Sequence, residues 1–185
     1  NIVIPNAGNI GSAGDTDAIA IASNGVVTIS QTPVGAGVAL TTATTVASTS
    51  GQAINFTGIP STVSRIMLVF RGVALSGTDQ IMIQLGTSSG LVTSGYLGTS
   101  GYGAGADDRT DSWVWYPANG TLSGVMTICH MGGNIYVQGH SSKYNANNTS
   151  FGGGDVAVGG VVDRLGIDTS GNATFSAGAI NIMFD

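Results

Sequence analysis

The chain has 185 residues and a formal net charge of −5, and only 8% of its residues are charged, against about 25% in ordinary globular proteins. It contains no glutamate, one lysine and 30 glycines. The acidic balance without a basic patch argues against nucleic acid as a partner. We find no apolar run of about 18 residues, so we expect no membrane insertion, and no basic-then-apolar start typical of a secretory signal. A single cysteine, Cys129, excludes an internal disulfide framework.

The composition predicts an all-β protein, because Gly, Thr, Ser, Val and Ile are abundant while helix-forming residues are scarce. The shortage of charge has two explanations. Either Ser, Thr, Asn and Gly solvate the surface, or neighbouring chains cover part of it. We favour the second explanation, a homo-oligomer, because closed symmetry covers surface with copies of one chain.

Residues 1–50 differ from the rest, since they contain no aromatic residue and only two charges, Asp15 and Asp17. A short pattern recurs at an offset of 17. Ile2-x-Ile4 with Gly8-x-Ile10 matches Ile19-x-Ile21 with Gly25-x-Val27. Each copy predicts a strand, a glycine turn and a second strand, too thin to bury a core alone. We therefore expect residues 1–50 to be a β-rich stem and oligomerisation segment, in which 41–50 form a strand edge or connector.

Residues 51–185 show longer period-two alternation, which is typical of half-buried strands. Apolar residues share one parity in the runs around Ile66, Ile81 and Leu165. Phe175 and Ile180 differ in parity, so a bulge is expected near 177–179. Eight or nine strands and no helical period predict an antiparallel β-sandwich head domain, with a jelly roll as the favoured version.

Two segments, 97–112 and 139–154, have the composition of long loops, which on a β-sandwich usually carry function. We expect them to be exposed and to hold the contact residues for a receptor. The candidate receptor-binding residues are Tyr102, Asp107, Asp108, Arg109, Asp111, His140, Lys143 and Tyr144.

The acidic residues allow two interpretations. Asp107, Asp108 and Asp111 could supply oxygen ligands for a hard cation such as Ca²⁺, but their spacing is not that of an EF-hand. The alternative, which we favour, is a solvated loop in which Arg109 pairs with a neighbour. Asp163 is a second candidate acid, or else a turn residue or the partner of an arginine. We expect no metal and no cofactor.

The remaining chemistry-bearing residues follow no catalytic motif. Cys129 beside His130 lacks the spacing of a zinc site, and a small buried hydrophobic role is the default for this cysteine. No nucleophile elbow, phosphate loop or dinucleotide motif is present, so we do not expect an enzyme. Trp113 and Trp115 share one face, as an aromatic platform for a sugar or, as we favour, as core or trimer-interface residues.

Several segments resemble bacteriophage tail-fibre and other virion-appendage proteins. Residues 14–31 are similar to segments common in that family. Residues 54–60, 65–70 and 72–77 resemble the start of its C-terminal β-sandwich module, and residues 163–165 and 175–182 resemble its end. The resemblance implies a homotrimer with an intertwined stem and a distal head that contacts the host surface. It transfers no catalytic residue, because the matching segments contain none.

The sequence and the resemblance together predict a virion fibre protein whose trimeric head binds a host-cell surface receptor, a glycan or a protein. Its N-terminal side would contact other virion proteins, which places it in the virion. One alternative is a structural virion protein, such as a capsid decoration or a fibre connector, without a receptor. Another is a glycan-degrading appendage with a carboxylate site at Asp107, Asp108 and Asp111 or at Asp163.

Overall fold

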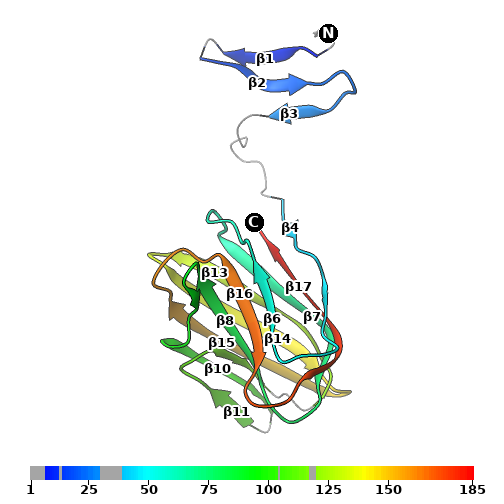
Figure 1. The fold of residues 1–185 in the computed structure, drawn as a ribbon, viewed down its shortest axis with the longest axis vertical. Coiled ribbons are helices and arrows are strands. Elements are labelled where there is room, and N and C mark those ends of the chain that lie inside the picture. The colour runs from blue at the N-terminus through cyan, green and yellow to red at the C-terminus, as the bar shows by residue number, and fades with distance from the viewer. Residues whose placement is uncertain (1–6, 13, 30–38, 104, 117–119) are drawn as a thin grey trace. The chain divides into compact units, whose positions relative to one another are not determined.

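A computed structural model describes residues 7–12, 14–29, 39–103, 105–116 and 120–185. The chain divides into two compact units, residues 1–39 and residues 40–185, and all described elements are β-strands (Figure 1). The boundary differs from the expected 50/51, because residues 41–47 pair with the last strand of the second unit. The described residues contain no helix of the length and apolar character that crossing a membrane requires.

The first unit is a three-stranded antiparallel sheet of β1 (Asn9–Ser12), β2 (Asp15–Ile21) and β3 (Val27–Ile29). Gly25, at φ 82°, allows the tight turn between β2 and β3, which confirms the second copy of the repeat. The first strand of the other copy, residues 2–4, lies outside the described residues. Ile10, Val27 and Ile29 are exposed within this chain, and none of the residues of this sheet whose burial the structure describes is buried.

The second unit is built from two sheets. The strands of the larger sheet are β4 (Thr41–Thr42), β5 (Val46–Ala47), β7 (Arg65–Leu75), β10 (Tyr96–Tyr102), β11 (Gly105–Asp108), β13 (Leu122–Gly132), β14 (Ile135–Tyr144), β15 (Asn148–Ala157) and β17 (Phe175–Phe184). The strands of the smaller sheet are β6 (Ile54–Thr57), β8 (Ile81–Thr87), β9 (Gly90–Leu91), β12 (Trp113–Trp115) and β16 (Arg164–Thr169).

The order of the larger sheet is β11-β10-β15-β14-β13-β7-β17, with β4 and β5 paired to the outer side of β17, and that of the smaller sheet is β12-β8-β16-β6. Four antiparallel pairs nest within one another: β7 with β17, β8 with β16, β10 with β15, and β13 with β14. This nesting is that of a jelly roll, except that the innermost hairpin, β13–β14, joins the larger sheet between β7 and β15.

The core lies between the two sheets, as the alternation predicted. Leu68 and Phe70 of β7 and Met126 of β13 point inward from the larger sheet, and Ile83 and Leu85 of β8 meet them from the smaller sheet. All five side chains are buried. The alternate residues of β7 and of β13–β15 face away from the core. Together they form the outer face of the larger sheet, which holds the candidate site.

Three details of the second unit bear on the predictions. It has twelve strands after residue 51 rather than eight or nine, because β9, β11 and β12 are very short. The expected irregularity of β17 is confirmed, with register shifts on both sides of Ala177 and Gly178 at φ 96°. The predicted loops 97–112 and 139–154 are wrong, because β10–β11 and β14–β15 occupy most of them.

Candidate binding site on the outer face of the larger sheet

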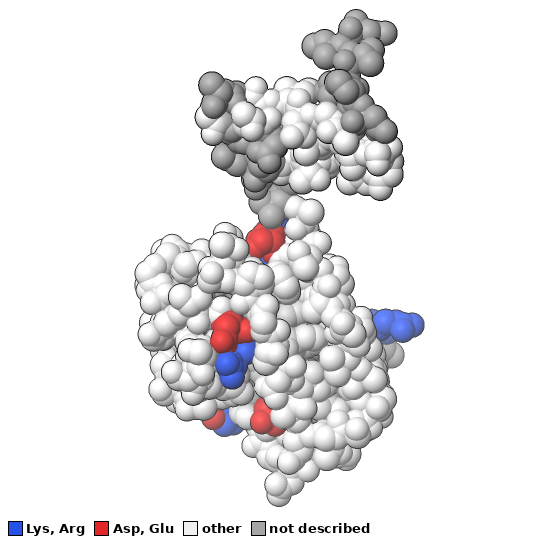
Figure 2. All heavy atoms as spheres, turned by 45° about the horizontal axis from the view of Figure 1, so that its top comes forward, with Lys and Arg blue, Asp and Glu red and all other residues white. Residues whose placement is uncertain are grey.

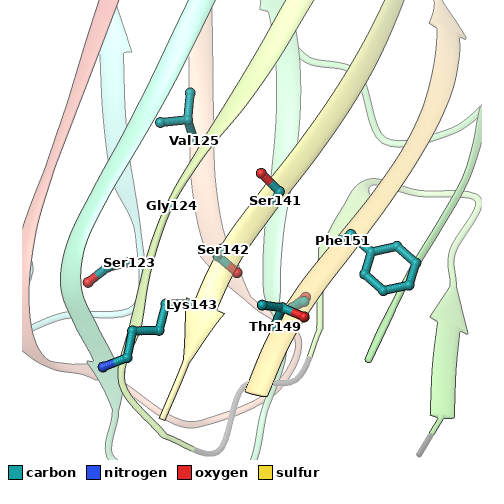
Figure 3. Close-up of a pocket in the computed structure, with 9 residues that line it drawn as sticks. Ser123, Gly124, Val125, Ser141, Ser142, Lys143, Thr149 and Phe151 are labelled. Atoms are coloured by element: carbon teal, nitrogen blue, oxygen red, sulfur yellow. The ribbon is translucent and has the colours of Figure 1, made fainter. Parts of the chain in front are cut away.

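A shallow depression of ≈ 510 Å³ lies on the outer face of β13, β14 and β15 (Figure 3). Strand register explains which side chains line it. Ser141 of β14 pairs with Val125 of β13 and Phe151 of β15, and Lys143 pairs with Ser123 and Thr149. The other lining residues are Gly124, Ser142 and Ser150.

The lining side chains leave the depression in different directions. In Figure 3 the Lys143 side chain reaches across β13 toward Ser123, whereas the Phe151 ring turns outward on the opposite side. Ser141 and Thr149 lie between them. Phe151 is 62% exposed, which is unusual for a phenylalanine in the middle of a sheet. The depression is therefore lined by an ammonium group, several hydroxyl groups and an aromatic ring.

A second hollow of ≈ 410 Å³ continues along the same face and shares Val125 and Ser141 with the first. Its floor is formed by small residues, because Gly139 pairs with Gly153 on β15 and Thr127 on β13. No side chain rises from Gly139 or Gly153, so the outer surface stays low between the row of Ser141 and the row of Val137. Together the two hollows form an open groove that could accept an extended, polar ligand.

The positive charges of the described chain are distributed unevenly between ion pairs and unpaired side chains. Among the described residues, three of the four arginines form ion pairs: Arg65 with Asp185, Arg109 with Asp111, and Arg164 with Asp163. Figure 2 shows such acidic and basic side chains next to each other within a largely uncharged surface. Arg71 and Lys143 form no ion pair with a described residue.

A buried polar cluster lies directly beneath the groove. The His140 Nε2 atom is 2.8 Å from Ser100 Oγ, and its Nδ1 atom is 2.9 Å from Gln138 Oε1. The Tyr116 N–H donates to Ser100 Oγ at 3.0 Å, so the Ser100 hydroxyl hydrogen is available to donate to Nε2. Burial lowers the pKa of the His140 imidazole to about 4. The ring is therefore neutral at physiological pH and donates through Nδ1.

Two further contacts fix this cluster to β12. The Trp115 Nε1–H donates to Ser142 Oγ at 3.0 Å, and the indole lies 5.0 Å from the His140 ring. Gly152 is required here, because an added Cβ would lie 2.5 Å from His140 Cε1. Ser100 and His140 resemble the nucleophile and base of a hydrolase. However, Ser100 is completely buried and already holds the Tyr116 N–H, so this pair links strands and is not open to a substrate.

The structure separates the predicted contact residues. Lys143 lines the depression. His140 and Tyr144 are buried, at 6% and 5% exposed, so the expectation that they belong to an exposed loop is wrong. Tyr102 is half-buried and packs against Tyr116 and Tyr144. The error has one physical reason: these residues alternate in and out of a sheet instead of projecting together from a loop.

The acidic residues adopt the alternative arrangements. Arg109 binds Asp111 through two hydrogen bonds of 2.8 Å, and this contact holds the pKa of the Asp111 carboxyl below its usual value. Asp107 and Asp108 lie on β11, and Asp108 with residues 109–111 lines a separate open hollow of ≈ 340 Å³. Asp163 pairs with Arg164 at 2.7 Å. No group of three metal-binding side chains occurs in the part of the chain that the structure describes.

The tryptophans and the cysteine are also placed. Trp113 and Trp115 are buried, at 1% and 0% exposed, and Trp115 stacks on Phe70 with ring centroids 4.6 Å apart. They are core residues, and the sugar-platform interpretation is wrong. Cys129 is exposed, contrary to the expected buried role, because Met126 and Ile128 take the inward parity of β13. His130 stacks on Tyr136 at 4.8 Å.

Sequence reasoning did not single out Phe151, Arg71 or Ser141 as site residues. The parity of β7 already placed Arg71 opposite the core residues, but the pairing of β7 with β13 joins positions about 50 residues apart. Comparison of the chain with protein-family models, curated protein sequences and solved structures found no match.

Proposed function

We propose that this chain is a homotrimeric, virion fibre-type attachment protein whose β-sandwich binds a glycan on a host-cell surface. The first unit acts as part of the stem that joins the other virion proteins. The observation that carries the proposal is the exposed Phe151 ring beside the hydroxyl-lined depression of β13–β15. An aromatic face stacks on the apolar side of a sugar, while Ser and Thr hydroxyl groups exchange hydrogen bonds with its hydroxyls.

The opposite end of the same outer face supports the trimer. Leu97, Met131, Ile135 and Val137 are exposed there, at 39–74%, and Val137 and Leu97 flank Asp155 in one cross-strand row. Val137 and Lys143 are six residues apart on β14, or about 20 Å along a strand. A cluster of large apolar side chains on a charge-poor chain is typical of a subunit contact. The proposal assigns this end to neighbouring subunits and leaves the depression open to ligand.

The test combines oligomeric state with binding. Light scattering coupled to size-exclusion chromatography should give a mass of three chains. Fluorescently labelled protein should bind host cells, and free surface polysaccharide should inhibit this binding by competition. The Phe151→Ala variant should bind about tenfold more weakly, because loss of half-covered aromatic surface corresponds to roughly 1.4 kcal/mol. Its melting temperature should be unchanged, since the ring is exposed.

The matched control is Val161→Ala, which shortens an exposed apolar side chain outside the outer face. This variant should bind like the parent protein. Equal binding by the Phe151→Ala variant would overturn the placement of the ligand. A monomer that binds virions but not cells would favour the structural virion protein instead.

A further inference from the structure

We infer that the depression selects an acidic polysaccharide, binding a sugar carboxylate between Lys143 and Arg71 while a neighbouring sugar lies against Phe151. This inference rests on the proposed function and names its ligand class. It begins from the five cations of the chain, of which three are neutralised by their own Asp partners. The two that have no carboxylate partner among the described residues lie at the same end of one sheet face.

Strand register brings these two cations together. Lys143 of β14 pairs with Ser123 of β13. On the other side of β13, Leu122 pairs with Val73 and Gly124 with Phe70, so the bulge places Arg71 and Gly72 opposite Ser123. Arg71 has the outward parity of β7 and is exposed. Arg71, Ser123 and Lys143 therefore form one row across three adjacent strands, spanning about 10 Å.

The central residue of this row can add a hydrogen bond. The backbone N–H of Gly72 donates to Ser123 Oγ at 2.8 Å, so the hydroxyl hydrogen of Ser123 remains free to donate outward. A carboxylate above Ser123 would receive this hydrogen bond together with the charged donors of Lys143 and Arg71. Hydrogen bonds between an ionised donor and a carboxylate are about twice as strong as neutral ones.

The surroundings do not oppose an anion at this end of the face. Asp155 is the outward-facing carboxylate of β15 and pairs with Val137. It is four positions from Phe151 along the strand, or about 13 Å. At that distance its field is largely screened at physiological ionic strength. Asp107 and Asp108 lie on β11, beyond β10.

The amount of charge distinguishes the kind of acidic polymer. Two cations suit one carboxylate on each repeating unit, as in a uronate-containing polysaccharide. A densely sulfated or phosphorylated polymer would carry many negative charges past a chain with a net charge of −5 and would be repelled. Phe151 lies one strand beyond Lys143, so a chain running from Arg71 to Phe151 crosses three strand spacings, about 14 Å. This length requires a short oligosaccharide rather than one sugar.

The test uses an array of surface oligosaccharides in which every uronate-containing member is matched by its carboxyl-reduced, neutral form. The full-length protein should be retained by uronate-containing members and about tenfold less by their reduced forms. Its binding should weaken as NaCl is raised. Lys143→Ala and Arg71→Ala should each lose most of the preference for the acidic forms. Lys143→Arg, which keeps the charge, should retain it.

The matched control is Arg164→Gln, which removes one positive charge from an ion pair on the smaller sheet. This variant should keep the preference for the acidic oligosaccharides, because that preference depends on the two cations of the row and not on the net charge of the chain. Equal binding to acidic and reduced members would overturn the inference and leave the proposed glycan-binding function standing. Sulfated oligosaccharides are placed on the same array, and stronger binding to them than to the uronate-containing members would likewise overturn the choice of a carboxylate. No binding to any member would overturn both the inference and the glycan function.

Discussion

Acidification should destabilise the sandwich through His140, and the structure gives the size of the effect. The imidazole is 6% exposed and is enclosed by Ser100 of β10, Trp115 of β12, Gln138 of β14 and Gly152 of β15. None of these neighbours is charged, so nothing compensates a proton on the ring. Its pKa falls from the ordinary 6.5 to about 4 because of burial.

The sign follows from which state binds the proton first. Between pH 6.5 and about 4 the unfolded chain is protonated at His140 while the folded chain is not, so the stability of the fold decreases as pH falls. Above 6.5 the full contribution is present, and below about 4 it is lost. The difference of about 2.5 pKa units corresponds to about 3 kcal/mol in the free energy of unfolding. The lowered pKa values of the Asp111 and Asp163 carboxyls reduce stability mainly as pH falls below their ordinary value of 3.8, so they contribute little within this window.

The assay is urea unfolding at several pH values between about 7.5 and 4.5, followed by tryptophan fluorescence, because Trp113 and Trp115 report on the core of the second unit. His140→Gln keeps a polar side chain between Ser100 and Gln138 but does not titrate, so its stability should change little across this range. If the free energy of unfolding of the His140→Gln variant depended on pH as steeply as that of the parent protein, the reasoning would be refuted.

Two further predictions concern packing. Gly152→Ala should lower the free energy of unfolding by about 1–3 kcal/mol, because the new methyl group meets the His140 ring and the Thr99 carbonyl oxygen. Gly153→Ala, whose Cβ would meet only the Gln138 carbonyl oxygen at 3.4 Å, should change it by no more than about 0.5 kcal/mol. Urea unfolding measures both variants, and equal losses of stability would contradict the assigned inward direction of residue 152. Asp79→Ala should lower the free energy of unfolding by about 1–3 kcal/mol, because the Ala173 N–H loses the carboxylate oxygen that accepts its hydrogen bond at 2.6 Å. Asp79→Asn, which keeps an oxygen acceptor, should recover part of this stability in the same assay.

The alternation of β7 and β8 made the sandwich predictable, because one buried face per strand produces a period of two that needs no tertiary information. The segment 148–157 shows where this reasoning ends. Its glycines and serines are typical of a loop, yet it is the strand β15. Gly152 and Gly154 are small because His140 and the backbone of β10 approach them closely. That requirement comes from the neighbouring strands and leaves no local pattern in the sequence.

The candidate site was predictable only in part for a related reason. Lys143 stood out by its rarity, but its partners Arg71 and Phe151 depend on the order of β7, β13, β14 and β15 in the sheet. A hairpin such as β13–β14 can be anticipated from the turn at residues 132–134. The pairing of β7 with β13 skips five intervening strands in the chain, and no short-range signal specifies its register.

The buried cluster and the proposed binding groove belong to the same strands, and this connection has a consequence for affinity. On β14 the inward residues His140 and Ser142 alternate with the outward residues Ser141 and Lys143. The hydrogen bonds to Ser100, Gln138 and Trp115 therefore fix the backbone from which the outward side chains project. A groove held in this way loses little backbone freedom when a ligand binds, so its few contacts contribute more fully to affinity. In the proposed trimer, three copies acting on one polymer would strengthen a weak interaction at each site.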